Sequence, residues 1–174
     1  MKVIEQEIHS LKNSISEMWA LVHQQLYNAG EAMLTGDKEL AYKVISRERR
    51  VNAFELKIDS DCEDIIALYA PVAIDLRFVL AMYKINTNLE RLGDFAESIA
   101  RFAGNLPEGE PIDPQLVKET RVEEMLSELL SMISLTKEAF EKESSEIASR
   151  IFLKDNLIDE INHNSTAIIA KYIE

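Results

Sequence analysis

The chain has 174 residues, of which 47% are hydrophobic and 29% are charged, as in an ordinary globular protein of one domain or two small halves. Its 19 Lys and Arg oppose 31 Asp and Glu, and the net charge of −12 argues against non-specific binding to the phosphate backbone of nucleic acids. Five glycines and four prolines are too few for an all-β chain, and the single cysteine excludes an internal disulfide.

Helical periodicity begins with the first residues of the chain. Apolar side chains recur at alternating steps of four and three from Ile4 to Met33, which predicts one long helix. Gly36 and Asp37 then provide an end signal and a start signal, because glycine accepts the left-handed cap conformation and aspartate caps the next helix. That second helix is expected to run to Tyr69.

A third helix is expected from about Val72 to Ala103, with Pro71 in its first turn, where the missing backbone donor costs nothing. Its main apolar seam consists of Phe78, Met82, Ile85, Leu89, Leu92, Ala96, Ile99 and Ala103. A second row lies on another face and predicts that this helix is packed between neighbours: Leu76, Leu80, Tyr83 and Thr87.

The segment 104–114 holds three of the four prolines and two of the five glycines, which is typical of a linker. A fourth helix follows it, marked by Met125, Leu129, Met132, Thr136 and Ala139. A fifth is marked by Ile147, Ile151, Ile158, Ile161, Ser165, Ile168 and Tyr172. With no strand pattern in the sequence, we predict an all-α fold of five long antiparallel helices.

The last two predicted helices repeat the first two. Residues 31–33 (Glu-Ala-Met) align with 138–140 (Glu-Ala-Phe), and 37–41 align with 144–148. The third helix has no second copy. We therefore divide the chain into a first repeat of three helices (1–103), the linker (104–114) and a second, incomplete repeat of two helices (115–174).

The chain carries no recognisable targeting or membrane-spanning signal. Acidic residues occupy the first positions, where a signal peptide would be apolar, and the uncharged run 65–74 is too short to span a bilayer. We therefore expect a cytoplasmic protein without membrane insertion.

No motif for nucleophilic catalysis and no phosphate-binding glycine loop is present, so we do not expect an enzyme. Cys62 falls on the apolar seam of the second helix and is expected in the core. The more informative residues are pairs of carboxylates one helical turn apart: Glu55 with Asp59, Glu90 with Asp94, and Asp155 with Asp159.

Like charges at this spacing destabilise a helix, so the pairs require either solvent or a cation. Two facing helices would gather four carboxylates, the ligands that hard divalent or ferric ions prefer. The same spacing recurs elsewhere in this acidic chain, and a solvated acidic face is the alternative interpretation. Gly93, between the residues of one pair, indicates either a close helix crossing or access for a ligand.

Three cations on the third helix, Arg77, Lys84 and Arg91, are spaced by sevens and therefore share one side of it. A solvated edge is one interpretation of this row, and a contact with a partner or an anion is the other.

The segment 88–100 (Asn-Leu-Glu-Arg-Leu-Gly-Asp-Phe-Ala-Glu-Ser-Ile-Ala) resembles the signature of PhoU, a bacterial family of phosphate-uptake regulators. Segments 51–59 and 71–77 also resemble this family, in the same order and spacing. The resemblance implies two tandem three-helix halves in a cytoplasmic, often dimeric protein with a negative regulatory role in phosphate uptake. It further implies action through the phosphate ABC transporter and the sensor kinase of the phosphate two-component system.

Members of this family carry iron or other metal sites on Glu/Asp-x-x-x-Asp motifs. By position, the resemblance assigns this role to Glu55, Asp59, Glu90 and Asp94. In the second half, Asp155 and Asp159 keep the spacing but align with Glu48 and Asn52, and the sixth helix of the family pattern is absent. A complete second metal site is therefore not expected.

Two other functions stay open at this point. A ferritin-like di-metal enzyme would need two Glu-x-x-His motifs, and the chain has one, at 160–163. A metal-free helical adaptor is the second alternative. Without a third helix, we expect the apolar stripes of the second half to be only partly buried, against the first bundle or against another copy of the chain.

Overall fold

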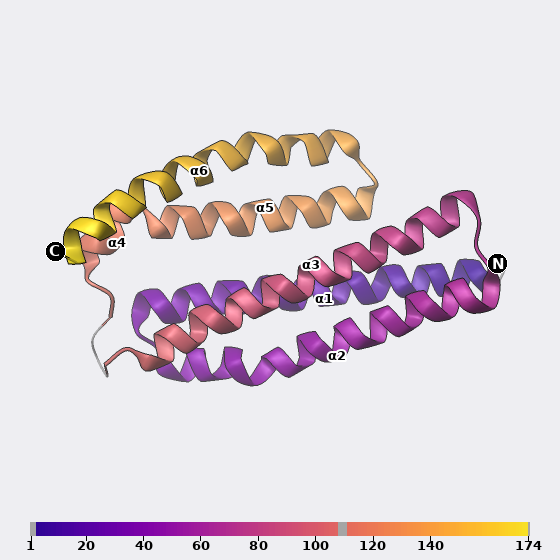
Figure 1. Cartoon of the computed structure of the whole chain (residues 1–174), viewed down its shortest axis with the longest axis horizontal. Coiled ribbons are helices and arrows are strands. Elements are labelled where there is room, and N and C mark those ends of the chain that lie inside the picture. Colours follow the sequence, from indigo (N-terminus) through magenta and orange to yellow (C-terminus); the bar gives the residue numbers. More distant parts are fainter. Residues whose placement is uncertain (1–2, 108–110, 174) are drawn as a thin grey trace.

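The structure is a computed structural model that describes residues 3–107 and 111–173. Within these ranges it contains helices and no strand, which confirms the all-α prediction. In chain order the helices are α1 (Val3–Thr35), α2 (Lys38–Tyr69), α3 (Ala73–Asn105), α4 (Pro114–Thr120), α5 (Val122–Lys142) and α6 (Ser145–Ile173) (Figure 1).

The turn between α1 and α2 forms as its residues predict. Gly36 has a φ of +71°, in the left-handed region that glycine adopts without strain. The Asp37 carboxylate accepts a 2.9 Å hydrogen bond from the backbone N–H of Leu40 and so caps α2. Local sequence chemistry is sufficient here, since both signals act within a few residues.

The turn between α2 and α3 differs from the prediction. Pro71 lies two residues before α3 rather than in its first turn. Ala70, with a φ of +44°, ends α2, and Val72 is extended, with φ −127° and ψ 160°. Because the chain reverses direction here, these residues form the connection, and the helix resumes only at Ala73.

Helices α1, α2 and α3 pack against one another and enclose one continuous apolar core. Its fully buried side chains include Leu11, Ile15, Met18, Val22, Val44, Val51, Ile58 and Val79. Complete burial of such a side chain contributes about 1.5–3 kcal/mol, so this three-helix bundle is the principal source of stability.

Packing of α3 is one-sided, contrary to the two-sided packing that its second apolar row predicts. Leu80 and Tyr83 of that row are 48% and 42% exposed. The reason is that α3 packs against α1 and α2 but the second layer of helices lies on α1. Gly93 marks a close helix crossing, because a Cβ at this position would lie 2.8 Å from Val51 Cγ1 of α2.

The connection to the second layer also departs from the predicted boundaries. Helix α3 continues to Asn105, and a short helix that the sequence analysis did not anticipate, α4, begins at Pro114. The Asp113 carboxylate caps α4 by accepting from the Gln115 N–H at 2.8 Å. Residues 108–110 of the predicted linker lie outside the described residues. The division of the chain into two repeats stays a prediction.

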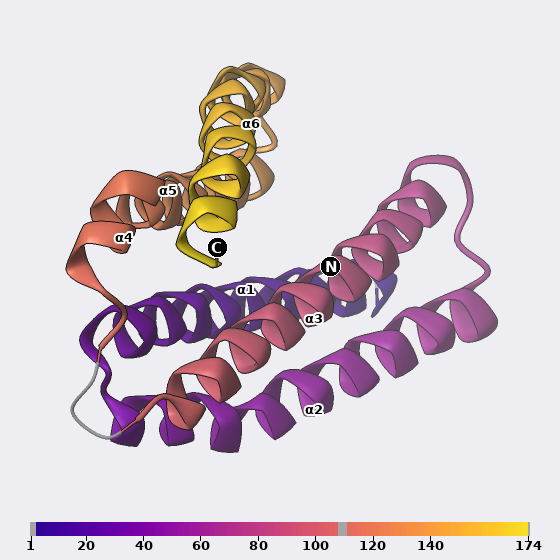
Figure 2. The same cartoon turned by 60° about the vertical axis from the view of Figure 1, so that its left-hand side comes forward.

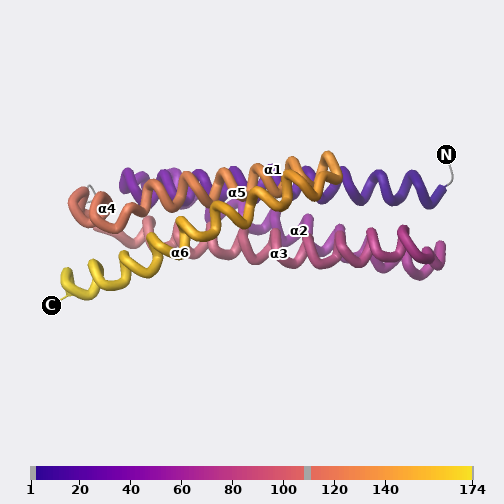
Figure 3. The backbone as a smooth tube through the Cα atoms, turned by 90° about the horizontal axis from the view of Figure 1, so that it is seen from above, coloured from indigo at the N-terminus to yellow at the C-terminus, as the bar shows by residue number. Residues whose placement is uncertain are grey.

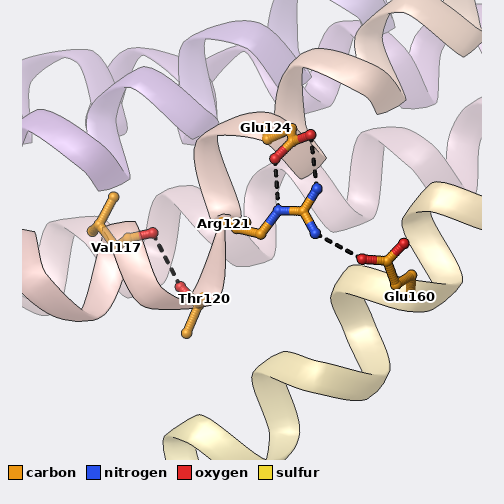
Figure 4. A network of polar contacts seen from close by, with 5 residues as sticks. All are labelled: Val117, Thr120, Arg121, Glu124 and Glu160. Carbon is orange, nitrogen blue, oxygen red and sulfur yellow. Dashed lines mark hydrogen bonds and ion pairs between the residues drawn. The ribbon is translucent and has the colours of Figure 1, made fainter.

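Arg121 separates α4 from α5 and ties both to α6. Its backbone is left-handed, with a φ of +55°, which breaks the helix. Its guanidinium donates to the Glu124 carboxylate at 2.7 and 2.9 Å and to the Glu160 carboxylate at 2.9 Å (Figure 4). One side chain therefore joins the start of α5 to the middle of α6.

The second layer contacts the bundle through α5, which lies along α1 (Figures 1 and 2). The Trp19 indole donates to the Ile133 carbonyl at 3.2 Å and stacks on Phe140 at 5.7 Å between ring centroids. Leu126 of α5 packs directly over Gly30 of α1. Helix α6 runs obliquely across α5 and packs on α5 and α4 (Figure 3).

The apolar stripes of the second layer are only partly buried, as predicted. Leu129 is exposed, and the others are half-buried: Met125, Met132, Ile151, Ile158 and Ile168. None of the described helices is both long enough and apolar enough to cross a membrane.

Candidate functional site

An acidic surface runs along the contact between α2 and α3. On α2, Glu48, Asn52, Glu55 and Asp59 follow at steps of four, three and four, so they share one face. On α3, Asn86, Glu90, Asp94 and Glu97 also share one face. The two helices are antiparallel neighbours, and these faces lie beside each other. We call this surface the acidic seam; its carboxylates are Glu48, Glu55, Asp59, Glu90, Asp94 and Glu97.

Asn86 organises one end of the acidic seam. Its side chain is fully buried, and its Nδ2 donates to Asp59 Oδ1 at 2.7 Å and to the Glu55 carbonyl at 2.9 Å. Asn86 Oδ1 has no hydrogen-bond partner. A buried amide oxygen without a partner is costly, so this oxygen is a free acceptor on a side chain that is bonded to the Asp59 carboxylate.

Two carboxylates of the acidic seam, Glu48 and Glu90, have raised pKa values, through partial burial and the charges of neighbouring acids. The pKa of Glu90 is raised by partial burial first, and then by the charges of Asp94, Glu55 and Glu48. The pKa of Glu48 is raised by partial burial and by Glu97. Repulsion between these acids is therefore not fully relieved within the protein.

One cation moderates this repulsion at the far end of the acidic seam. Arg101 Nη2 pairs with Glu97 Oε1 at 2.6 Å, and its charge partly offsets the rise in the pKa of Glu48. The main causes of the Glu90 shift, by contrast, all raise its pKa: burial and the neighbouring acids.

Three of the four predicted ligands lie close enough for their charges to interact: Glu55 and Asp94 both act on the pKa of Glu90. Asp59 lies at the end of the same face, held by Asn86. Within residues 3–107 and 111–173, however, no three His, Cys, Asp or Glu side chains are arranged so that they could hold one metal ion. The donors are of the right chemical type, but they do not form a closed coordination sphere, and the four-ligand site stays a prediction.

Four residues of this surface were not predicted from the sequence to belong to it: Glu48, Asn52, Asn86 and Glu97. The continuous helical spacing on each face is the signal that could have found them. Asp155 and Asp159, the carboxylate pair of the second half, are exposed on α6, on the opposite side of the molecule from α2 (Figures 1 and 2). They do not join the acidic seam.

The surroundings of the other residues singled out in the sequence show which of them can take part in a site. Cys62 is buried, as predicted, and burial raises the pKa of its thiol to about 12, so it is not a reactive thiolate. Glu160 of the single Glu-x-x-His segment is paired with Arg121. Arg77, Lys84 and Arg91 are exposed on the outer side of α3, and none of them forms an ion pair with another described residue.

Comparisons with known proteins agree with this architecture. A family model described as the PhoU domain matches residues 15–103. Over 169 residues the chain is 33% identical to a phosphate-specific transport system accessory protein PhoU homolog of Aquifex aeolicus, covering 96% of this chain and 74% of that protein.

Two solved structures are similar along almost the whole chain. The crystal structure of the phosphate transport system regulatory protein PhoU from Streptococcus pneumoniae gives a TM-score of 0.83 at 30% identity, over 96% of this chain and 77% of that one. The crystal structure of PhoU from Pseudomonas aeruginosa gives a TM-score of 0.89 at 27% identity, over 97% of this chain and 79% of that one.

Proposed function

This chain belongs to the PhoU family, and from that membership we propose that it regulates phosphate uptake through contacts with other proteins. The observation that carries the proposal is the match in both sequence and fold over nearly the entire chain. The family consists of regulatory accessory proteins and not of enzymes, in keeping with the sequence expectation.

The partners that we propose are the phosphate ABC transporter and the sensor kinase of phosphate-starvation signalling, met in the cytoplasm. Long exposed helix faces support this proposal, because they offer surface on which other proteins can dock. A homodimer is supported by exposed apolar side chains on α6, where Phe152, Leu153 and Ile173 are 76%, 75% and 80% exposed. Sedimentation at low micromolar concentration should give a dimer, and a monomer that binds no hydrophobic dye would contradict this.

We further propose that the acidic seam binds metal cations. Glu55, Glu90 and Asp94 would supply carboxylate oxygens, with Glu48 and the free Asn86 amide oxygen beside them. Hard divalent or ferric ions fit this donor set, and family resemblance favours iron. A bound cation would neutralise the repulsion that raises the pKa of Glu90, and the side chains would have to rotate to complete its coordination.

Metal analysis of protein purified without a chelator tests this second proposal. The pair of substitutions Glu90→Gln and Asp94→Asn should lower the bound metal severalfold. The matched pair Asp155→Asn and Asp159→Asn removes the same charge from α6 and should leave the metal content unchanged. If both pairs lower it equally, or if the wild-type protein holds no metal, cation binding at the acidic seam is wrong.

The regulatory proposal has its own test in cells. The gene should restore repression of a phosphate-starvation reporter at high phosphate in a bacterium that lacks its own PhoU. Immunoblotting must show that the protein is present and intact. Full reporter activity in the presence of folded protein would overturn the proposed function, whatever the metal content.

A further inference from the structure

The outer side of α3 carries positive charge and apolar side chains together. Arg77, Lys84 and Arg91 are spaced by two helical turns, so they stand about 10 Å apart along one line. Leu80, Phe95 and Phe102 lie on the same side and are 48%, 55% and 51% exposed. We call these six residues the basic face. It is unusual in a chain of net charge −12.

A groove runs beside the basic face, between α3 and the second layer. It has a volume of about 220 Å³ and is lined by Trp19, Ile85, Asn88, Leu89, Leu92, Ile133 and Thr136. Asn88 lies one turn from Lys84 and one turn from Arg91, so the groove and the basic face are continuous along α3. The groove exists because α5 lies on α1 and leaves α3 uncovered (Figure 2).

We infer that the groove and the basic face together bind an acidic amphipathic helix of a partner protein. The inference rests on the proposed function, because it names the surface for one of the proposed protein contacts. A helix of this kind places apolar residues at i, i+3, i+4 and i+7 into the groove. Acidic residues on its flank, repeated every seven positions, would match the two-turn spacing of Arg77, Lys84 and Arg91.

Charge complementarity favours an acidic helix as the ligand of the basic face. The three cations have no ion-pair partner among the described residues, so they are available to a ligand. The net negative charge of the rest of the chain disfavours encounters elsewhere, and the adjacent groove distinguishes these three cations from the exposed cations of α2, Lys43, Arg49 and Arg50. Attraction at the basic face therefore fixes where the helix docks and in which register.

An anionic membrane fits the same surface less well. Three cations near a lipid surface contribute only about 1 kcal/mol each, and the net charge of −12 opposes them. The acidic seam lies on the neighbouring side of the same helix, where Asp94 is exposed. A concave groove with Trp19 in its wall also suits a helix better than it suits a flat bilayer.

The test uses a synthetic helical peptide with leucines at i, i+3, i+4 and i+7 and glutamates repeated every seven positions. Trp19 is the only tryptophan of the chain and lines the groove, so its emission reports binding directly. We expect a saturable change. The reversal of the three cations should weaken binding at least about tenfold: Arg77→Glu, Lys84→Glu and Arg91→Glu.

A matched triple on α2 controls for overall charge, since it changes the net charge equally at exposed positions: Lys43→Glu, Arg49→Glu and Arg50→Glu. It should weaken binding less than about twofold. Circular dichroism checks the fold of both triples. If the α3 triple does not fold, the salt dependence of peptide binding to the wild-type protein replaces it as the test. Binding should weaken when the salt concentration is raised from about 50 mM to about 500 mM, because salt screens the attraction between charges.

Several results would overturn the inference: no saturable change in Trp19 emission, equal weakening by both triples, or salt-independent binding. Anionic vesicles that bind through the three cations while the peptide does not would assign the surface to a membrane instead. Loss of self-association in the α3 triple would assign it to a second copy. If the protein binds the peptide normally but fails the reporter assay, the proposed regulatory function is wrong and the inference about peptide binding still holds.

Discussion

Helices α1–α3 and helices α4–α6 carry apolar stripes of similar spacing, but only the first group encloses them. In α1–α3 the stripes form one continuous core that includes Ile15, Ile58 and Leu89. Among the described residues of α4–α6, Ala139 and Ile161 are the apolar side chains that reach full burial.

The difference follows from how extensively each helix is packed. Every helix of the bundle packs along its length against two other long helices, whereas α6 rests on one long helix, α5, and on the seven-residue α4, and α5 reaches the bundle through α1. An apolar stripe becomes core only when a third element covers it. The stripe therefore predicts a helix reliably, but it does not predict how deeply its side chains are buried.

A matched pair of isoleucines should show the largest contrast between the two regions. Ile58→Ala in α2 removes a fully buried side chain and should lower the free energy of unfolding by about 2–5 kcal/mol. Ile158→Ala in α6 removes a half-buried one and should cost about 1 kcal/mol. Chemical denaturation measures both, and equal losses would refute the contrast.

The packing of α5 against α1, which connects the two regions, should depend on Gly30. A Cβ at this position would lie 2.1 Å from Leu126 Cδ2, so Gly30→Leu should force α5 away from α1 and cost about 1–3 kcal/mol. Gly104→Leu is the control, because its nearest neighbour is a Tyr42 carbon at 4.0 Å. Limited proteolysis should cleave α4–α6 faster in the first variant only. Unchanged cleavage would mean that this packing does not depend on the close approach.

The acidic seam should give the bundle a pH dependence opposite in sign to that of the second layer, where hydrogen bonds from Arg121, Lys142 and Lys12 lower the pKa values of Glu124, Glu138 and Glu143. Because the pKa of Glu90 is raised in the folded protein, its ionised form destabilises the fold at neutral pH. That penalty is present above the folded pKa of Glu90, falls as the pH drops through it, and vanishes only below the usual glutamate pKa of about 4.3.

Glu90→Gln should therefore stabilise the protein at pH 7 by only a few tenths of a kcal/mol, since solvent screens a partly exposed carboxylate, and the gain should vanish once the pH is below the usual glutamate pKa of about 4.3. Thermal melts of the wild type and the variant across this range measure it. Glu146→Gln, at an exposed position of α6, is the control. A gain that grows on acidification would have the wrong sign.

The smallest effect is expected from the ion pairs that tie the second layer together. Arg121→Gln keeps a non-glycine residue at a positive φ but removes the link to Glu160. The melting temperature should fall slightly at low salt and match the wild type at high salt, because exposed ion pairs are screened. Arg49→Gln on α2 should show no such salt dependence. A loss that persists at high salt would indicate a role other than ion pairing.

By itself, the sequence determined the features that depend on neighbours in the chain. Gly36 and Asp37 set the first turn, because the cap and the left-handed residue act within a few positions. The helical periodicity set the all-α class, and the spacing of Glu55 with Asp59 and of Glu90 with Asp94 placed each pair on one face of its helix.

Only the tertiary structure decided which faces meet. Burial of Asn86 against Asp59, and the repulsion of Glu48 by Glu97, depend on the register between α2 and α3, which no local pattern specifies. The exposure of Leu80 and Tyr83 depends on α5 docking against α1 instead of α3. The physical reason is that periodicity fixes the direction of a side chain relative to its own helix, whereas burial and charge coupling depend on the position of another helix.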